Sequence, residues 1–80
     1  MNQEQILAEL QQIFCEVLKR DNIIINETST SNDVEGWDSL THMIIISKIE
    51  KHFGIMFNFR ELMKLKNVGD LRDVIQTKMK

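Results

Sequence analysis

Apolar residues recur every three or four positions in three stretches of this 80-residue chain, which is the spacing of one face of an α-helix. Proline is absent and only three glycines are present, so little interrupts these stretches and a turn-rich β architecture is disfavoured. We therefore expect an all-α fold with three main helices, at residues 2–19, 39–52 and 68–78. The apolar stripes of the first and last helices are Ile6, Leu7, Leu10, Ile13, Phe14, Val17 and Leu18, and Val68, Leu71, Val74, Ile75 and Met79.

Helix-capping residues stand at the expected helix starts and mark one further helix, which is short and covers about residues 59–64. We expect Phe57 to pack on Leu62 and staple the start of this short helix. The capping pairs are Asn2 with Gln5, Asn58 with Glu61, and Asn67 with Asp70.

The connection from Asp21 to Trp37 is long, and a loop of this length in a small domain is usually functional. It begins with Ile23, Ile24 and Ile25 and then turns polar. Because no partner strand is visible, we expect a loop that inserts these isoleucines into the helical core rather than a β-strand. We expect Trp37 to pack the end of this loop against the helices.

Size and charge narrow the classes of function. Eighty residues form one small domain, which has room for a modest core but not for a deep, water-free catalytic cleft. The net charge is −2 without a basic stripe, which argues against nucleic acid as a partner. The longest apolar run, residues 43–46, is too short for membrane insertion. The single cysteine, Cys15, and the lack of a signal peptide predict a cytoplasmic protein, and we expect the Cys15 thiol to be exposed and without function.

The segment Gly-Trp-Asp-Ser-Leu at residues 36–40 places a serine where a loop becomes a helix. Gly36 permits backbone angles that other residues resist, and Asp38 is a good N-cap for the second helix. Ser39 then lies in the first turn, where free N–H groups and the positive end of the helix dipole favour an attached phosphate.

The second helix has two apolar faces. At about 100° per residue, one face forms the core side and consists of Ile45, Ile46, Ile49 and Phe53. The nearly opposite face consists of Leu40, Met43 and Ile44, joined by Ser47 and Lys51. Exposed apolar residues that cluster beside Ser39 indicate a partner surface, with cover by the short third helix as the alternative.

Three motifs carry a family resemblance. The chain has Asp38-Ser39-Leu40 after a long loop, a helix that ends Ile49-Glu50-Lys51-His52-Phe53-Gly54-Ile55, and a last helix that begins Asn67-Val68-Gly69-Asp70-Leu71. Over essentially its whole length the chain resembles the acyl carrier protein family. The form Gly-Trp-Asp-Ser-Leu-Thr-His resembles stand-alone, specialised bacterial carriers more than the main fatty-acid carrier.

The resemblance implies that residues 1–80 form a single domain, a small antiparallel four-helix bundle that is a carrier and not an enzyme. It implies that a separate phosphopantetheinyl transferase attaches 4′-phosphopantetheine from coenzyme A to Ser39, and that Asp38 helps to present Ser39 to it. The arm would carry acyl intermediates as thioesters to the ligase, synthase or acyltransferase enzymes of a fatty acid, polyketide or related pathway. An aminoacyl or peptidyl carrier of a nonribosomal-type pathway is the alternative. A monomer suits a protein that visits several enzymes.

In this family the exposed side of the second helix is the recognition face, which by position consists of Leu40, Met43, Ile44, Ser47 and Lys51. The best-known members carry acidic residues on this face. This chain instead has Ile44 and Lys51 at two such positions, and its helix adds Lys48, His42 and His52. We therefore expect dedicated partners with a more apolar docking site.

Two other classes of function explain less of the sequence. A small serine esterase would need a nucleophile elbow, but Thr41 replaces its last glycine. His42 lies toward the core side without a third orienting group, so we expect no catalytic residue and no metal ligand. A non-carrier helical interaction module would explain the second apolar face but not the capped serine or the long loop.

Overall fold

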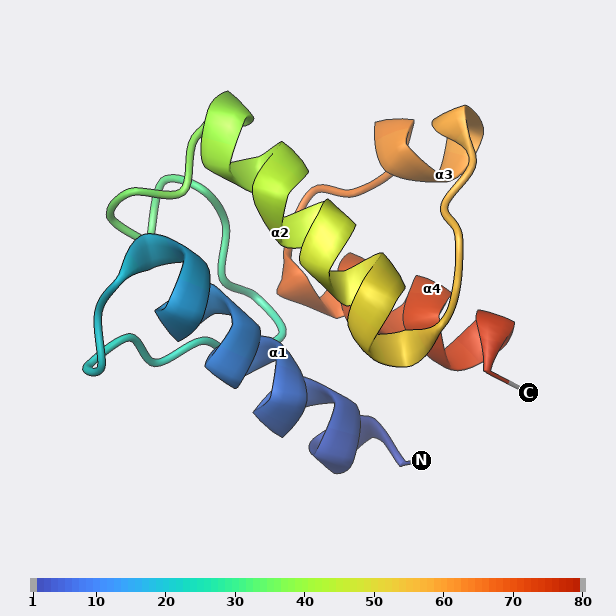
Figure 1. Cartoon of the computed structure of the whole chain (residues 1–80), viewed down its shortest axis with the longest axis horizontal. Helices are drawn as coiled ribbons and strands as arrows, with labels where there is room; N and C mark the ends of the chain where they lie inside the picture. Colours follow the sequence, from blue (N-terminus) through green and yellow to red (C-terminus); the bar gives the residue numbers. More distant parts are fainter. Residues whose placement is uncertain (1, 80) are drawn as a thin grey trace.

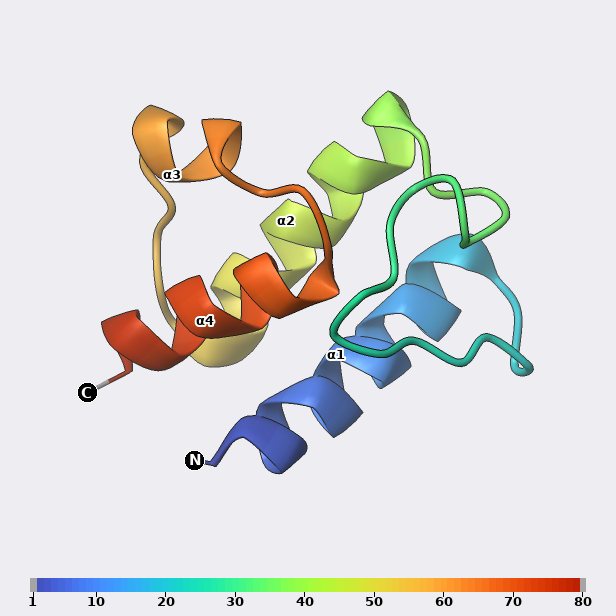
Figure 2. The same cartoon turned by 180° about the vertical axis from the view of Figure 1, so that it is seen from behind.

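The computed structural model describes residues 2–79, and within them the chain forms four helices (Figure 1). They are α1 (Gln3–Leu18), α2 (Ser39–Phe53), α3 (Phe59–Met63) and α4 (Val68–Lys78). Helix α1 packs against α2 and α4 and runs antiparallel to both, while α3 lies on the side of α2 away from α1 (Figures 1 and 2). The predicted all-α bundle is confirmed. None of the helices in this described part has the length and apolarity needed to cross a membrane.

Side-chain caps explain where the helices begin. In α1, α3 and α4 the cap oxygen lies 2.8 Å from the backbone nitrogen three residues later, which satisfies an amide that would otherwise have no partner. The caps are the predicted ones, Asn2, Asn58 and Asn67. Helix α2 ends at Gly54, whose φ of 69° is a left-handed conformation that glycine adopts without strain.

The core lies between the inward faces of α1, α2 and α4. Its most deeply buried side chains are the aliphatic residues that helical spacing predicted, together with Phe14. Burying each such side chain contributes roughly 1.5–3 kcal/mol before the entropy of folding is subtracted. Met79 follows the end of α4 and remains exposed, so its assignment to the apolar stripe is wrong. The fully buried residues are Ile6, Leu10, Phe14, Ile45, Ile49, Val68, Leu71 and Ile75.

The connection between α1 and α2 is a loop, as predicted, but only part of its isoleucine run enters the core. Ile25 is buried and Ile23 packs against the core, whereas Ile24 is 81% exposed. The prediction that all three plug the bundle is wrong, because successive side chains of an extended segment point to opposite sides. Trp37 packs the end of the loop as predicted, with its ring edge-on to Phe14 at a centroid distance of 4.8 Å.

The single cysteine lies beneath this loop. Cys15 is half-buried, and its Sγ is 3.7 Å from the carbonyl oxygen of Ile23. The prediction of an exposed thiol is therefore wrong. Helical spacing placed Cys15 outside the apolar stripe, but it could not show that the returning loop covers that side of α1.

Backbone hydrogen bonds join the same loop to the start of α4. The N–H of Val68 donates to the carbonyl of Ser29 at 2.9 Å, and the N–H of Gly69 donates to the carbonyl of Glu27 at 2.8 Å. Arg72, one turn further along α4, pairs with the Glu27 carboxylate at 3.1 Å. These contacts fix the loop that leads to α2, and so they help to position the residues at the start of α2.

Candidate functional site

Ser39 is the first residue of α2, and it is exposed. The Asp38 side chain caps this helix with one oxygen, Oδ1, which accepts the N–H groups of Leu40 and Thr41 at 3.0 Å each. In return the Thr41 hydroxyl accepts the Asp38 N–H at 2.8 Å, which completes a capping box. The N–H donated by Thr41 is the main reason that the pKa of Asp38 lies below its usual value. Asp38 is therefore a charged cap at neutral pH.

Thr41 also ties the helix to the loop before it. Its hydroxyl donates to the carbonyl of Gly36 at 2.7 Å. Gly36 has a φ of 90°, which is the left-handed region that the sequence led us to expect at this glycine. The backbone on both sides of Ser39 is thus held by hydrogen bonds, and the serine side chain projects from a fixed position.

Trp37 and His42 form a contact across the start of α2 that sequence reasoning did not find. The indole Nε1–H of Trp37 donates to Nδ1 of His42 at 3.0 Å, and the two rings are stacked with their centroids 5.9 Å apart. His42 is half-buried on the core side, as predicted, and burial lowers the pKa of His42 below its usual value. Trp37 and His42 are five residues apart and lie on either side of the start of α2. This spacing matches neither helical nor strand periodicity, so the sequence pattern did not predict the pair.

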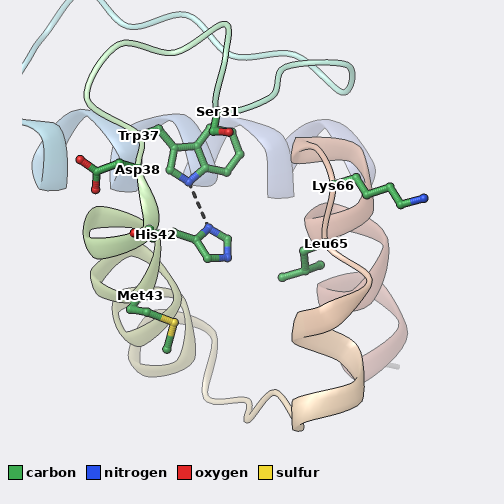
Figure 3. Close-up of a pocket in the computed structure, with 8 residues that line it drawn as sticks. Ser31, Trp37, Asp38, His42, Met43, Leu65 and Lys66 are labelled. Carbon is green, nitrogen blue, oxygen red and sulfur yellow. Dashed lines mark hydrogen bonds between the residues drawn. The ribbon is translucent and has the colours of Figure 1, made fainter.

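A groove of about 500 Å³ opens beside Ser39, between the start of α2 and the connection from α3 to α4 (Figure 3). Leu65 points across the groove toward His42, whereas the Lys66 side chain extends away from it (Figure 3). Both apolar and hydrogen-bonding side chains line the groove, and Ser31, Leu65 and Lys66 were not predicted as site residues. The lining residues are Ser31, Trp37, Asp38, Ser39, His42, Met43, Leu65 and Lys66.

The second apolar face of α2 is open to solvent. The exposed fractions are 72% for Leu40, 54% for Met43 and 46% for Ile44, so α3 does not cover this face. Ser47 and Lys51 are exposed beside them. Sequence reasoning missed that apolar exposure continues along the α2–α3 connection and α3, at Met56, Phe59 and Met63.

Charges on α2 are mostly directed away from its apolar face. Glu50, the only acidic residue of α2, accepts the backbone N–H of Phe57 at 2.9 Å. On the side that faces α1, Lys48 pairs with Glu16 at 3.4 Å, and His52 contacts Glu9 at 2.9 Å. The face formed by Leu40, Met43, Ile44, Ser47 and Lys51 therefore carries no acidic residue.

Comparisons with known proteins agree with this fold. The chain matches the phosphopantetheine attachment site family over residues 8–75. An acyl carrier protein of an Exiguobacterium species is 34% identical over 79 residues, which cover 99% of this chain and 100% of that relative. The acyl carrier protein of Thermosynechococcus vestitus is 34% identical over 80 residues, which cover 99% of this chain and 98% of that relative.

A solved structure has the same fold. The solution NMR structure of a holo acyl carrier protein from Geobacter metallireducens superposes with a TM-score of 0.87 at 43% identity, covering 92% of this chain and 85% of that one. The match to the attachment-site family spans more than half of the chain and includes α2 with the serine at its start. The resemblance to the acyl carrier protein family is thus confirmed. This chain belongs to the acyl carrier protein family, and it is an acyl carrier that bears covalently attached 4′-phosphopantetheine.

Proposed function

We propose that the Ser39 hydroxyl is the attachment point of the 4′-phosphopantetheine arm, through a phosphodiester bond. Exposure of Ser39 at the first position of α2 is the observation that carries this proposal. A transferase can reach the hydroxyl there without unfolding the bundle. The positive end of the α2 dipole also stabilises the negative charge of a phosphodiester at this position.

The residues beside Ser39 suit the arm. The arm combines methylene and methyl groups with two amides, and the groove next to Ser39 offers both apolar side chains, such as Met43 and Leu65, and polar ones, such as Ser31 and His42. Its volume of about 500 Å³ lies within the range of about 300–1,000 Å³ that is typical of small-molecule sites. The arm supplies a terminal thiol, which holds the acyl cargo as a thioester.

The chain itself acts as a carrier rather than as a catalyst. Asp38 holds the first turn of α2 in place, and we propose that its charged carboxylate also helps to present Ser39 to the transferase. A tethered cargo is held near each enzyme at a high effective concentration, so it need not be captured again from solution at every step. The name acyl carrier protein, which the relatives share, favours an acyl cargo of a fatty acid, polyketide or related pathway over an aminoacyl one.

We propose the face formed by Leu40, Met43, Ile44, Ser47 and Lys51 as the surface on which partner enzymes dock. These partners are the phosphopantetheinyl transferase and the ligase, synthase or acyltransferase enzymes that load and use the cargo. Because the face is apolar and lacks acidic residues, we expect partner surfaces that are apolar as well. A cytoplasmic location, the natural setting for such enzymes, stays a prediction from the sequence.

The decisive experiment is intact-mass spectrometry after incubation with coenzyme A, Mg²⁺ and a broad-specificity transferase. We expect a gain of one phosphopantetheine in the wild-type protein and no gain in Ser39→Ala. Thr77→Ala is the control, because it removes an exposed hydroxyl from α4, outside the proposed docking face, and this variant should load fully. A folded Ser39→Ala protein that still gains the group would overturn the assignment.

A further inference from the structure

His42 presents a hydrogen-bond donor whose position is set by Trp37. The indole nitrogen of Trp37 can only donate, so the His42 Nδ1 that it contacts at 3.0 Å must be the unprotonated nitrogen of the ring. The proton of the neutral imidazole then resides on Nε2. In Figure 3 this second nitrogen lies on the side of the ring away from Trp37, within the groove beside Ser39.

Helix geometry places this donor within reach of a group attached to Ser39. His42 follows Ser39 by three residues, and side chains with this spacing are neighbours on a helix surface, with about 5–6 Å between their Cβ atoms. Long side chains of a helix also lean toward its N-terminus, so the His42 ring covers the turn that begins with Ser39. Leu65 closes the opposite side of the groove with an apolar contact surface.

We propose that His42 is a positioning residue, whose Nε2–H donates a hydrogen bond to an amide carbonyl of the phosphopantetheine arm lying in this groove between Trp37 and Leu65. Trp37 contributes by holding the imidazole in the tautomer that keeps this donor available. The arm then has a docked position on the carrier, which it leaves when a partner enzyme takes up the cargo. This inference rests on the proposed attachment at Ser39. The charged groups at the groove are the Asp38 carboxylate, which caps α2, and Lys66, whose side chain extends outward.

Nuclear magnetic resonance of the apo and holo forms tests the proposal without an activity assay. We expect arm attachment to shift the resonances of His42 Nε2, the Trp37 indole N–H and the Leu65 methyl groups. We also expect nuclear Overhauser contacts between the geminal methyl groups of the arm and Trp37 or Leu65. The mass of the sample shows independently whether the arm is attached, so failed loading and failed docking are distinguishable.

Two variants separate a hydrogen bond from simple packing. His42→Phe keeps a ring but has no donor, and it should reduce the docked fraction about two- to twelvefold, which corresponds to the loss of one net hydrogen bond. His42→Gln keeps an N–H donor and should restore part of the docking. Trp37→Phe removes the indole donor, so the proton of the His42 imidazole should no longer be fixed on Nε2. This is visible as a change in the His42 Nδ1 and Nε2 chemical shifts of the apo protein. The variant should also weaken docking of the arm.

Two results would overturn the proposal. The first is a fully loaded protein in which the Trp37, His42 and Leu65 resonances match those of the apo form. The second is a folded, loaded His42→Phe protein in which the contacts of the arm keep their full intensity. If His42→Phe does not fold, the apo-to-holo change at His42 Nε2 in the wild-type protein decides alone.

Discussion

The backbones of Gly69 and Glu27 approach each other more closely than any side chain at position 69 would permit. The Gly69 N–H donates to the Glu27 carbonyl oxygen at 2.8 Å, and a Cβ on Gly69 would lie only 2.7 Å from that oxygen. This contact attaches the middle of the long loop to the first turn of α4. It therefore connects the segment that leads to Ser39 with the helix furthest from it in sequence.

We expect Gly69→Ala to destabilise the protein by about 1–3 kcal/mol, the usual effect of forcing a group into a filled space. The direction is diagnostic, because alanine inside a helix ordinarily stabilises it relative to glycine. Urea denaturation measures the change. Thr77→Ala, at an exposed position of the same helix, should alter the free energy of unfolding by no more than about 0.5 kcal/mol. Equal or higher stability of Gly69→Ala would contradict the contact.

We expect the Asp38 cap to make the free energy of unfolding depend on pH in the acidic range. Hydrogen bonds from Thr41 and Leu40 lower the pKa of Asp38 in the folded state, so its contribution is present above the unfolded pKa of about 3.9 and is lost as pH falls through the folded pKa. Asp38→Asn keeps a cap and should lose this part of the acid dependence. Asp38→Ala should be less stable than Asp38→Asn at neutral pH. Thermal melts between pH 2 and pH 7 measure both effects.

His42 should make stability depend on pH in a higher range. Burial lowers the pKa of His42 in the folded state, so the unfolded chain takes up a proton first as pH falls below about 6.5. The free energy of unfolding should therefore decrease from pH 7.5 toward pH 5.5. Denaturant unfolding should show a smaller decrease for His42→Gln than for wild type. His52→Gln, at an exposed position, controls for the second histidine, and an unchanged slope in His42→Gln would contradict the assignment.

A charge placed on the exposed apolar face of α2 should weaken the binding of partner enzymes without affecting folding. We expect Met43→Glu and Ile44→Glu to keep the helical circular dichroism spectrum, because both side chains are exposed. Loading by the transferase should slow by roughly fivefold or more, which is the effect of losing about 1 kcal/mol at a contact residue. Ile24→Glu, on the exposed part of the loop, is the control and should load at the wild-type rate.

The apolar character of this face also predicts a weak dependence of partner binding on salt. Charged contacts are screened when ionic strength rises, whereas apolar contacts are not weakened in this way. We expect the dissociation constant for a dedicated partner enzyme to change less than about threefold between 50 mM and 300 mM NaCl, compared with at least tenfold for contacts dominated by charge. Isothermal titration at both salt concentrations measures this. Tight binding at low salt that disappears at high salt would contradict an apolar docking site.

Local patterns were sufficient for the helices and for the position of Ser39. Helical spacing identified the core side of α2, and the capping chemistry of Asp38 located its first turn, because both depend only on neighbours in the sequence. The features that were missed depend on long-range packing. The half-burial of Cys15 arises where the loop returns over α1, and Leu65 reaches the groove only because α3 and its connections bring it opposite His42.

Helix α2 unites the anchoring serine and the exposed Leu40, Met43 and Ile44 in one rigid rod that is braced against α1. An enzyme that binds these side chains therefore finds the attachment point of the arm at a constant distance and direction from its docking surface. How far the cargo reaches is then decided by the length of the arm alone. Enzymes with unrelated active sites can share this carrier, provided that the entrance to each active site lies at the same position relative to the bound α2.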